Sequence, residues 1–273
     1  MAIKGRFALI TGAASGMGLE IAKLFASEGA IVACCDINSC DHVVDIIQSS
    51  GGTAKAFTFN ARDKFDIQRL AKEVLEWTGN MLDILINNAG VSSVVMLDGD
   101  DDTYEATWDF VFDINVRAQQ RLSRALLPQL LASEFSGRIV NVASTEGLGA
   151  TIFNSAYVAS KHASVGLTKA MAVELGSRAV TVNCVCPGPV RTGMTKDILE
   201  NQKELFAKRL VPMRRYGNPA EIAYMHLALV DDRATFTNGC VVNVDGGILA
   251  NNALLPMRLP WEKKKVPRSS SRL

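Results

Sequence analysis

Long hydrophobic runs are absent from this sequence. No apolar stretch of the 273 residues reaches the roughly 18 residues that a membrane-spanning helix needs. The chain passes from Met1–Arg6 directly into a strand-like segment, with no apolar leader between them. We therefore expect a protein that is neither secreted nor inserted into a membrane.

Paired metal-binding motifs are also missing. The six cysteines include no paired CxxC spacing suited to zinc, and His42 and His226 stand isolated. The cysteines, most of them within apolar strand-like runs, are Cys34, Cys35, Cys40, Cys184, Cys186 and Cys240. We expect free, buried thiols in a reducing compartment and no metal site.

Most of the chain lacks an excess of positive charge. The formal net charge is +1, but six of the 29 basic residues and one of the 28 acidic residues follow residue 250. The preceding body is therefore mildly acidic, which makes nucleic acid an unfavourable partner. The content of 48% hydrophobic and 21% charged residues instead favours a globular chain with a large apolar core.

Short β-branched runs alternate with longer amphipathic stretches along the chain. Strands are expected at 6–11, 31–36, 53–60, 82–87, 137–144, 180–186 and 240–244. Helices are expected at 15–28, 38–50, 63–79, 103–132, 155–177, 195–210 and 219–231. The pattern predicts an α/β fold with a doubly wound, seven-stranded parallel sheet and helices on both faces, in one domain over 1–250. Residues 251–273, which contain three prolines and a lysine triplet, are expected to form a basic tail.

A glycine-rich turn, with Gly12, Gly16 and Gly18, lies between the first strand and the first helix. Glycines at this position let the backbone approach a phosphate, and the amides at the start of the helix face the anion. The second strand ends at Asp36, where a carboxylate can accept hydrogen bonds from an adenosine ribose but repels a 2′-phosphate. The neighbouring positions hold no basic residue, so the sequence favours NAD over NADP.

Two further motifs complete a family pattern. Asn87-Asn88-Ala89-Gly90 ends the fourth expected strand, and Tyr157-Val158-Ala159-Ser160-Lys161 follows a fifth expected strand that ends at Ser144. With the glycine turn, these motifs make residues 5–250 resemble the short-chain dehydrogenase/reductase family. The resemblance implies a Rossmann-type fold and reversible hydride transfer between a nicotinamide cofactor and a secondary alcohol or ketone, without a metal.

The resemblance also implies a set of cofactor-binding residues. Gly12, Gly16 and Gly18 would hold the pyrophosphate, and Asp36 the adenosine ribose. The full set is Gly12, Ser15, Gly16, Met17, Gly18, Asp36, Ile37, Asn60, Ala61, Asn88, Ala89, Gly90, Tyr157, Lys161, Pro187, Gly188, Val190 and Thr192. Asn60 stands where the family usually has an aspartate that meets the adenine amino group, and its side-chain carbonyl could still accept that hydrogen bond.

Four residues match the family's catalytic tetrad: Asn115, Ser144, Tyr157 and Lys161. Tyr157 and Lys161 are four residues apart on an expected helix, so their side chains share one face. Acid/base catalysis near neutrality requires the pKa of a tyrosine, about 10, to fall by roughly 2 to 3 units. A nearby ammonium and the positive charge of the oxidised nicotinamide both favour the phenolate. We expect Tyr157 to be the general acid/base, Ser144 to bind the reacting oxygen and Asn115 to position a water that links Lys161 to solvent.

Residues that follow Ser144 and Gly188 are expected to line the substrate pocket. The candidates for substrate contact are Ser144, Glu146, Asn154, Tyr157 and Met194. Apolar neighbours at its mouth would be Val94, Met96, Leu148, Ile152 and Phe153. This mixture suits a medium-sized, largely apolar alcohol or ketone. The segment 188–216 is expected to close over the substrate as a lid.

Location, partners and function each leave an alternative open. Ser271-Arg272-Leu273 is a variant of the Ser-Lys-Leu address, so we expect a peroxisomal import receptor as partner if the source is a eukaryote, and a cytoplasmic protein otherwise. The family resemblance implies a homodimer or homotetramer. Two rival functions are an NADPH-dependent ketoreductase of a biosynthetic pathway and a non-catalytic dinucleotide-binding protein.

Overall fold

A seven-stranded parallel sheet forms the centre of the protein. The computed structural model describes residues 2–251, so the sequence predictions for residues 252–273, including Ser271-Arg272-Leu273, lie outside the described residues. The strands are β1 (Phe7–Thr11), β2 (Ile31–Asp36), β3 (Thr53–Thr58), β4 (Ile84–Asn87), β5 (Gly137–Val142), β6 (Val180–Pro187) and β7 (Val241–Val244). Their order is β3-β2-β1-β4-β5-β6-β7, with every pair parallel, which confirms the predicted fold class.

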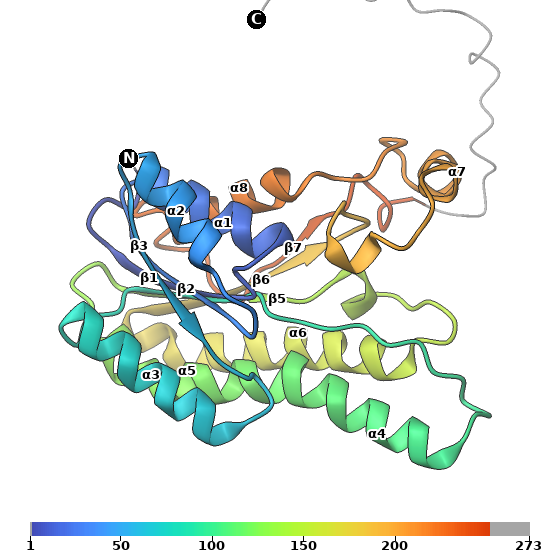
Figure 1. The fold of residues 1–273 in the computed structure, drawn as a ribbon, viewed down its shortest axis with the longest axis horizontal. Helices are drawn as coiled ribbons and strands as arrows, with labels where there is room; N and C mark the ends of the chain where they lie inside the picture. Colours follow the sequence, from blue (N-terminus) through green and yellow to red (C-terminus); the bar gives the residue numbers. More distant parts are fainter. Residues whose placement is uncertain (1, 252–273) are drawn as a thin grey trace, which may run out of the picture.

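Helices cover both faces of the sheet (Figure 1). One face carries α1 (Gly16–Ser27), α2 (Asp41–Ser49) and α8 (Pro219–Val230), and the other carries α3 (Lys64–Thr78), α5 (Ala118–Ala132) and α6 (Ser155–Leu175). Helix α4 (Asp101–Phe112) joins α5 through a π-helical turn at Asp113–Arg117. Helix α7 (Glu200–Leu210) lies apart from both layers, on the connection that follows β6 (Figure 1).

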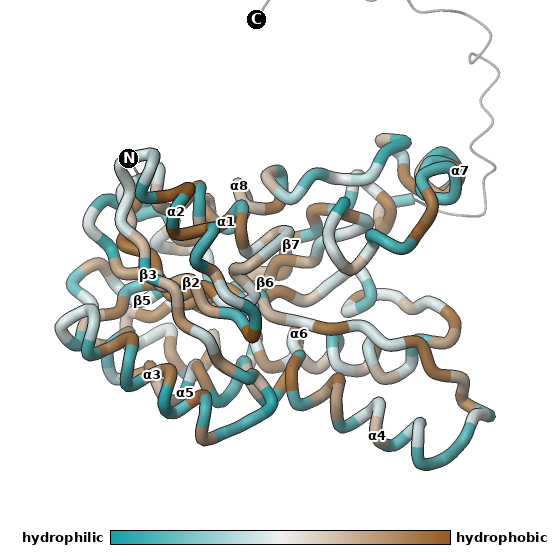
Figure 2. Tube along the Cα trace, in the orientation of Figure 1, coloured by the Kyte–Doolittle hydropathy of each residue, from teal (hydrophilic) through white to brown (hydrophobic). Residues whose placement is uncertain are grey.

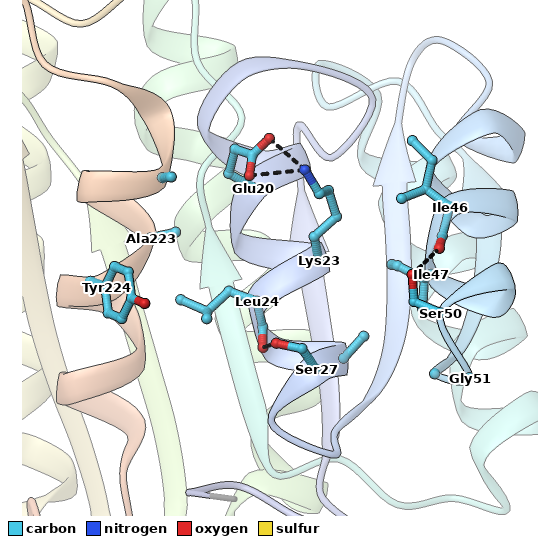
Figure 3. A pocket seen from close by; sticks show the side chains of 13 residues that line it. Glu20, Lys23, Leu24, Ser27, Ile46, Ile47, Ser50, Gly51, Ala223 and Tyr224 are labelled. Carbon is cyan, nitrogen blue, oxygen red and sulfur yellow. Dashed lines mark hydrogen bonds and ion pairs between the residues drawn. The ribbon is translucent and has the colours of Figure 1, made fainter.

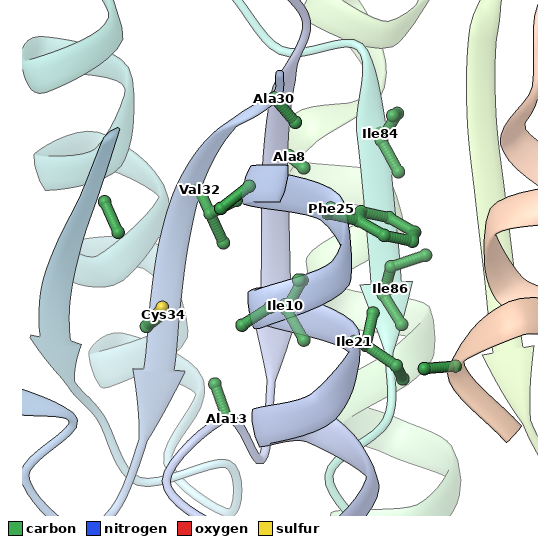
Figure 4. Close-up of a cluster of buried hydrophobic side chains, with 14 of the residues drawn as sticks. Ala8, Ile10, Ala13, Ile21, Phe25, Ala30, Val32, Cys34, Ile84 and Ile86 are labelled. Atoms are coloured by element: carbon green, nitrogen blue, oxygen red, sulfur yellow. The ribbon is translucent and has the colours of Figure 1, made fainter. Parts of the chain in front are cut away.

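Burial on both faces explains why the strands read as continuous apolar runs rather than as alternating patterns. Every residue of β5 and β6 is buried. Hydrophobic residues follow the central strands in Figure 2. Figure 4 shows part of one face, where Phe25 and Ile21 of α1 pack over Ile10, Ile84 and Ile86 of the sheet.

Several strands end earlier than the sequence predicts, because a polar side chain turns back on the main chain. The third strand ends at Thr58 rather than residue 60. The fifth ends at Val142, and Ser144 instead starts a short 3-10 turn at Thr145–Gly147, where its hydroxyl accepts a hydrogen bond from Glu146 N at 3.2 Å. Strand ends are therefore the least accurate part of the prediction.

Two helix predictions also change in detail. The helix expected at 103–132 is present, but the π-helical turn divides it and places Asn115 in the divided region. The helix expected at 195–210 begins only at Glu200, after a separate 3-10 turn at Gly193–Thr195. Gly29 follows the C-cap of α1, Glu28, and has a positive φ of 87° that glycine adopts without strain.

Five of the six cysteines are free and buried, as expected. Cys240 is free but exposed, so the prediction of a buried thiol is wrong there; it directly precedes β7, which lies at the edge of the sheet. Within residues 2–251, no helix combines the length and the apolar character needed to cross a membrane. The same residues contain no group of three or more His, Cys, Asp or Glu side chains that could hold a metal ion.

Candidate active site

A cavity of about 550 Å³ opens at the carboxyl ends of the central strands. All the predicted cofactor residues line it except Gly18, and so do three of the four predicted catalytic residues, Ser144, Tyr157 and Lys161. Asn115 lies outside the lining. Several lining residues were not predicted: Asn38, Phe59, Val91, Ser92, Ile114, Val142, Ala143, Pro189, Gly193 and Thr195.

The glycine turn is packed so tightly that side chains do not fit in it. A Cβ on Gly18 would lie 2.0 Å from Gly12 O, and a Cβ on Gly12 would lie 2.8 Å from Asn88 Nδ2. Gly16 has a φ of +55°, and a Cβ there would lie 3.3 Å from Thr192 Cβ, across the cavity. The turn therefore presents bare backbone to the cavity, while Gly18 lies beneath it against Gly12.

Thr11 joins the glycine turn to the turn after β4. Its hydroxyl accepts hydrogen bonds from Asn88 N and Ala89 N, both at 3.0 Å. Asn88 Nδ2 in return donates to Thr11 O at 2.8 Å and to Gly12 O at 3.3 Å. The sequence argument did not include Thr11 among the site residues, although a threonine at the end of a strand and before a glycine turn is a usable signal.

Asp36 is held in place by the main chain on both sides. Its Oδ2 accepts from Ala14 N at 3.1 Å, and its Oδ1 accepts from Asn38 N at 3.0 Å and from Asn38 Nδ2 at 3.3 Å. The carboxylate thus sits where the sequence placed it, between the glycine turn and the end of β2. Asn38 was missed, but an asparagine two residues after a strand-ending aspartate is a common turn signal.

Asn60 lines the cavity, but its side chain is turned toward its own loop. Asn60 Oδ1 accepts a hydrogen bond from Arg62 N at 3.0 Å, and Asn60 N donates to Asp66. The oxygen proposed from the sequence to meet an adenine amino group therefore already has one donor. A carbonyl oxygen can accept a second hydrogen bond, so the predicted contact requires Asn60 to share this oxygen.

Tyr157 and Lys161 lie on one face of α6, as predicted, with Lys161 Nζ 5.5 Å from the centre of the Tyr157 ring. Lys161 is buried and donates to Val142 O at 3.0 Å. Burial lowers the pKa of Lys161 to about 8.

In the protein alone, the pKa of Tyr157 lies above its ordinary value. Burial raises it to about 12, and the hydrogen bond with Ser144 offsets only part of this rise. The Lys161 ammonium and the positive charge of an oxidised nicotinamide are the two influences expected to lower this pKa, and both act against burial. Positive charge beyond that of Lys161 is therefore needed for Tyr157 to ionise near neutral pH.

Asn115 is buried under the site rather than exposed in the cavity. Its Oδ1 accepts from Val91 N at 2.9 Å, and its Nδ2 donates to Val91 O at 2.9 Å and to Ser160 Oγ at 3.0 Å. A Cβ on Gly90 would lie 3.2 Å from Asn115 Oδ1 and 3.3 Å from Lys161 Nζ. Glycine at position 90 therefore allows Asn115 and Lys161 to approach the same point, and the water predicted beside Asn115 stays a prediction.

The predicted substrate residues are only partly brought together. Met194 lines the cavity, 55% exposed, beside Ser144 and Tyr157. Glu146 and Asn154 do not line it: the Glu146 carboxylate accepts from Thr151 Oγ1 at 3.2 Å, and Asn154 immediately precedes α6. Their substrate contacts stay predictions.

A second hollow, of about 440 Å³, lies between α1, α2 and α8 (Figure 3). Its charged groups pair within α1, where Lys23 Nζ donates to Glu20 Oε1 at 2.9 Å. Ser27 and Ser50 donate to carbonyls of their own helices. These charged and hydroxyl groups are thus satisfied within their own helices, whereas Asp36, Ser144, Tyr157 and Lys161 line the first cavity.

Comparison with known proteins agrees with this arrangement of residues around the cavity. The family model of enoyl-(acyl carrier protein) reductase matches residues 12–249. The 3-oxoacyl-(acyl-carrier-protein) reductase of Thermotoga maritima is 34% identical over 251 residues, which cover 91% of this chain and 100% of that protein. The chain belongs to the short-chain dehydrogenase/reductase family. Members of this family are NAD(P)-dependent oxidoreductases that act on alcohol or ketone groups.

Two solved structures of the family are close in fold. A Beutenbergia cavernae protein, named as an NAD(P)-dependent gluconate 5-dehydrogenase and containing NADP, has a TM-score of 0.85 and 34% identity; the match covers 92% of this chain and 99% of that one. A 7α-hydroxysteroid dehydrogenase with NADH and 7-oxo glycochenodeoxycholic acid has a TM-score of 0.84 and 32% identity, covering 90% of this chain and 94% of that one. A nicotinamide dinucleotide is therefore the cofactor of this short-chain dehydrogenase/reductase.

Proposed function

We propose that this enzyme transfers a hydride between NAD and a secondary alcohol or ketone carbon of a medium-sized, largely apolar substrate. The observation that carries the proposal is the convergence of Ser144, Tyr157 and Lys161 on the cavity that also contains the glycine turn and Asp36. These side chains come from three separate parts of the chain, and the fold brings all of them to the carboxyl ends of parallel strands.

The shape of the cavity fits a dinucleotide. Gly12 and Gly16 leave bare backbone at the cavity, which a pyrophosphate could approach, and the start of α1 directs free amides toward it. Asp36 would bind the adenosine ribose, and Val190 and Thr192 would contact the nicotinamide carboxamide. When bound, the cofactor accepts or supplies a hydride at the nicotinamide C4 and, in its oxidised form, adds positive charge to the cavity.

The choice of NAD over NADP rests on Asp36. Its carboxylate faces the region of the cavity next to the glycine turn, and the adjacent Ile37 is an exposed apolar residue. A 2′-phosphate would be repelled by this negative charge. Related structures contain NADP in one case and NADH in another, so the charge at position 36 is the observation that favours NAD here.

Tyr157 exchanges a proton with the substrate oxygen. In ketone reduction the neutral hydroxyl donates its proton to the developing alkoxide, which suits a group with its pKa raised by burial. In alcohol oxidation the phenolate accepts the proton, and the Lys161 ammonium together with the cofactor charge favours this form. Ser144 has its hydroxyl beside Tyr157, where it can bind the same oxygen in either direction.

Exposed apolar side chains around the cavity support a largely apolar substrate. Leu97 is 82% exposed, Ile152 79% and Leu199 62%, on the connections that follow β4, β5 and β6. The first two connections join where Val95 N donates to Phe153 O at 3.0 Å. None of the three lines the cavity, but these connections leave the same edge of the sheet at which it opens, so a substrate larger than the cavity would meet their apolar side chains; Figure 2 shows hydrophobic stretches on these loops.

Hydride transfer, followed through the absorbance of the reduced nicotinamide, tests the proposal directly. The assay uses secondary alcohols and ketones of increasing apolar size, with NAD(H) and NADP(H) in parallel, for wild type and Tyr157→Phe. We expect turnover with NAD(H) that rises with apolar size and falls by about 10²- to 10⁴-fold in the variant. Cofactor binding without turnover on any substrate would instead support a non-catalytic dinucleotide-binding protein, and a preference for NADP(H) would favour the ketoreductase alternative.

A further inference from the structure

A buried glutamine lies directly beside the active-site lysine. Gln119, the second residue of α5, is 2% exposed, and its Nε2 is 3.5 Å from Val142 O. Lys161 Nζ donates to this same carbonyl oxygen at 3.0 Å. Two side chains from different helices therefore share one acceptor at the end of β5, immediately beneath the cavity.

The Gln119 amide is more polar than packing alone requires. Within the described chain its Oε1 is buried and has no hydrogen-bond partner. The other positions on this side of α5 include Leu122, Leu126 and Leu130, all buried and apolar. An apolar side chain of similar length at position 119 would fill the space without the cost of an unpaired buried oxygen.

Lys161, in contrast, needs hydrogen-bond acceptors. A buried ammonium has three donors and is stable only where acceptors replace the lost water. The Val142 carbonyl supplies one acceptor, and Gln119, whose Nε2 shares that carbonyl, carries a second, unpaired acceptor in its Oε1. The two groups thus match in hydrogen-bonding capacity: the ammonium has spare donors and the amide has a spare acceptor.

We propose that Gln119 is a positioning residue for Lys161, anchored at the Val142 carbonyl that the two side chains share and offering its Oε1 to the ammonium. The inference rests on the proposed role of Lys161. The extra acceptor favours the charged form of the lysine, opposing the effect of burial, and keeps the ammonium beside Tyr157. Charged Lys161 in turn favours the Tyr157 phenolate.

Few titratable groups face Lys161, so a change in its titration can be assigned to the replacement of Gln119. The titratable ones are Tyr157 on its own helix and Cys184 and Cys186 on β6. None of them changes when Gln119 is replaced, so a shift in the titration of Lys161 reports on the amide. Gln129 provides a matched control on the same helix: its Nε2 donates to Asn80 Oδ1 at 3.0 Å, and its Oε1 has no partner in the described chain.

The titration of Lys161 is measured by NMR on protein labelled with ¹³Cε-lysine, and the signal is assigned through its loss in Lys161→Met. We expect the pKa of Lys161 to fall by about one unit in Gln119→Met and to be unchanged in Gln129→Met. Gln119→Glu should raise the pKa instead, because a carboxylate attracts the ammonium. An unchanged pKa in a folded Gln119→Met or Gln119→Glu protein would overturn the inference.

Enzyme kinetics supply a second readout. In Gln119→Met, the rising limb of the pH dependence of alcohol oxidation should move to higher pH, while the dissociation constant of NADH stays within about twofold of wild type. A merely structural role would change the melting temperature and leave this limb in place. If wild-type protein shows no turnover, the proposed function fails, but the NMR titration still decides whether Gln119 acts on Lys161.

Discussion

The two sides of the active-site cavity are built by different kinds of contact. On the cofactor side, backbone atoms press against each other: a Cβ on Gly18 would lie 2.0 Å from Gly12 O. On the catalytic side, buried polar side chains bond across helices, as Asn115 does with Ser160 and Val91. The first side leaves no room for a Cβ at Gly12 or Gly18, whereas the second is held by hydrogen bonds between buried side chains of different elements.

The largest effect that this comparison predicts is on the cofactor side. Gly18→Ala should lower the free energy of unfolding by about 3 kcal/mol or more and abolish measurable NAD binding, since the glycine turn must open to admit a methyl group. Thermal melting and NADH fluorescence titration measure both. Gly166→Ala in α6, where a Cβ would meet nothing within 4 Å, should be neutral or slightly stabilising. A Gly18→Ala protein that binds NAD normally would refute the steric account.

A change on the catalytic side should leave the fold intact and alter the pH dependence. Lys161→Met removes the ammonium that favours the Tyr157 phenolate, so the pKa of Tyr157 rises further above its ordinary value. We expect alcohol oxidation at pH 7 to fall by about 100-fold or more and its rising limb to move to higher pH. The pH profile of kcat/KM measures this.

The control for this change is Lys169→Met, at an exposed position on the same helix, which should behave as wild type. An unshifted pH profile in Lys161→Met would mean that the lysine does not act through Tyr157.

The choice between NAD and NADP tests whether charge also matters on the cofactor side of the cavity, where close backbone packing is the main feature. Asp36→Ala removes the carboxylate that repels a 2′-phosphate, so the ratio of kcat/KM with NADP to that with NAD should rise by about tenfold or more. Parallel assays with both cofactors give the ratio. Asp45→Ala, at an exposed position on α2, should leave the ratio unchanged. If Asp36→Ala also leaves it unchanged, Asp36 does not set the choice between the two cofactors.

The smallest effect is expected at the mouth of the cavity. Ile152→Ser should raise the KM for an apolar substrate by about three- to tenfold, because roughly 1 to 1.5 kcal/mol of apolar contact is lost. Val173→Ser, which alters an equally exposed side chain on α6, should have no effect on KM. If the two substitutions changed the KM equally, Ile152 would not contact the substrate, and the argument for an apolar substrate would fail.

The cofactor side was the easier half to predict from sequence. A Cβ at Gly12 or Gly18 would collide with neighbouring atoms, and Gly16 has a positive φ that favours glycine, so the crowded turn leaves a visible motif. The strand that ends at Asp36 is short and apolar, so the position of its carboxylate could also be inferred. Strand ends were less accurate, since Asn60 and Ser144 bond to their own main chain instead of extending the strand.

Contacts on the catalytic side could not be predicted, because they join residues far apart in sequence. Gln119 and Lys161 meet only at Val142 O, which belongs to a third element. Burial of the Tyr157 hydroxyl raises its pKa, and no sequence pattern indicates this, because the loss of solvent around the hydroxyl depends on every segment packed against it. Glu146 and Asn154 were expected in the cavity from their position after Ser144, but the loop places them outside its lining.

The sequence by itself determined the α/β class, the parallel order of elements, the glycine turn and the pairing of Tyr157 with Lys161. These features follow from local rules: the period of apolar residues, the need for glycine at a crowded turn, and the four-residue spacing on a helix. The tertiary structure alone decided which polar groups are buried together and how far burial shifts their pKa values. Burial and partner choice are properties of the whole packed chain, so no local pattern encodes them.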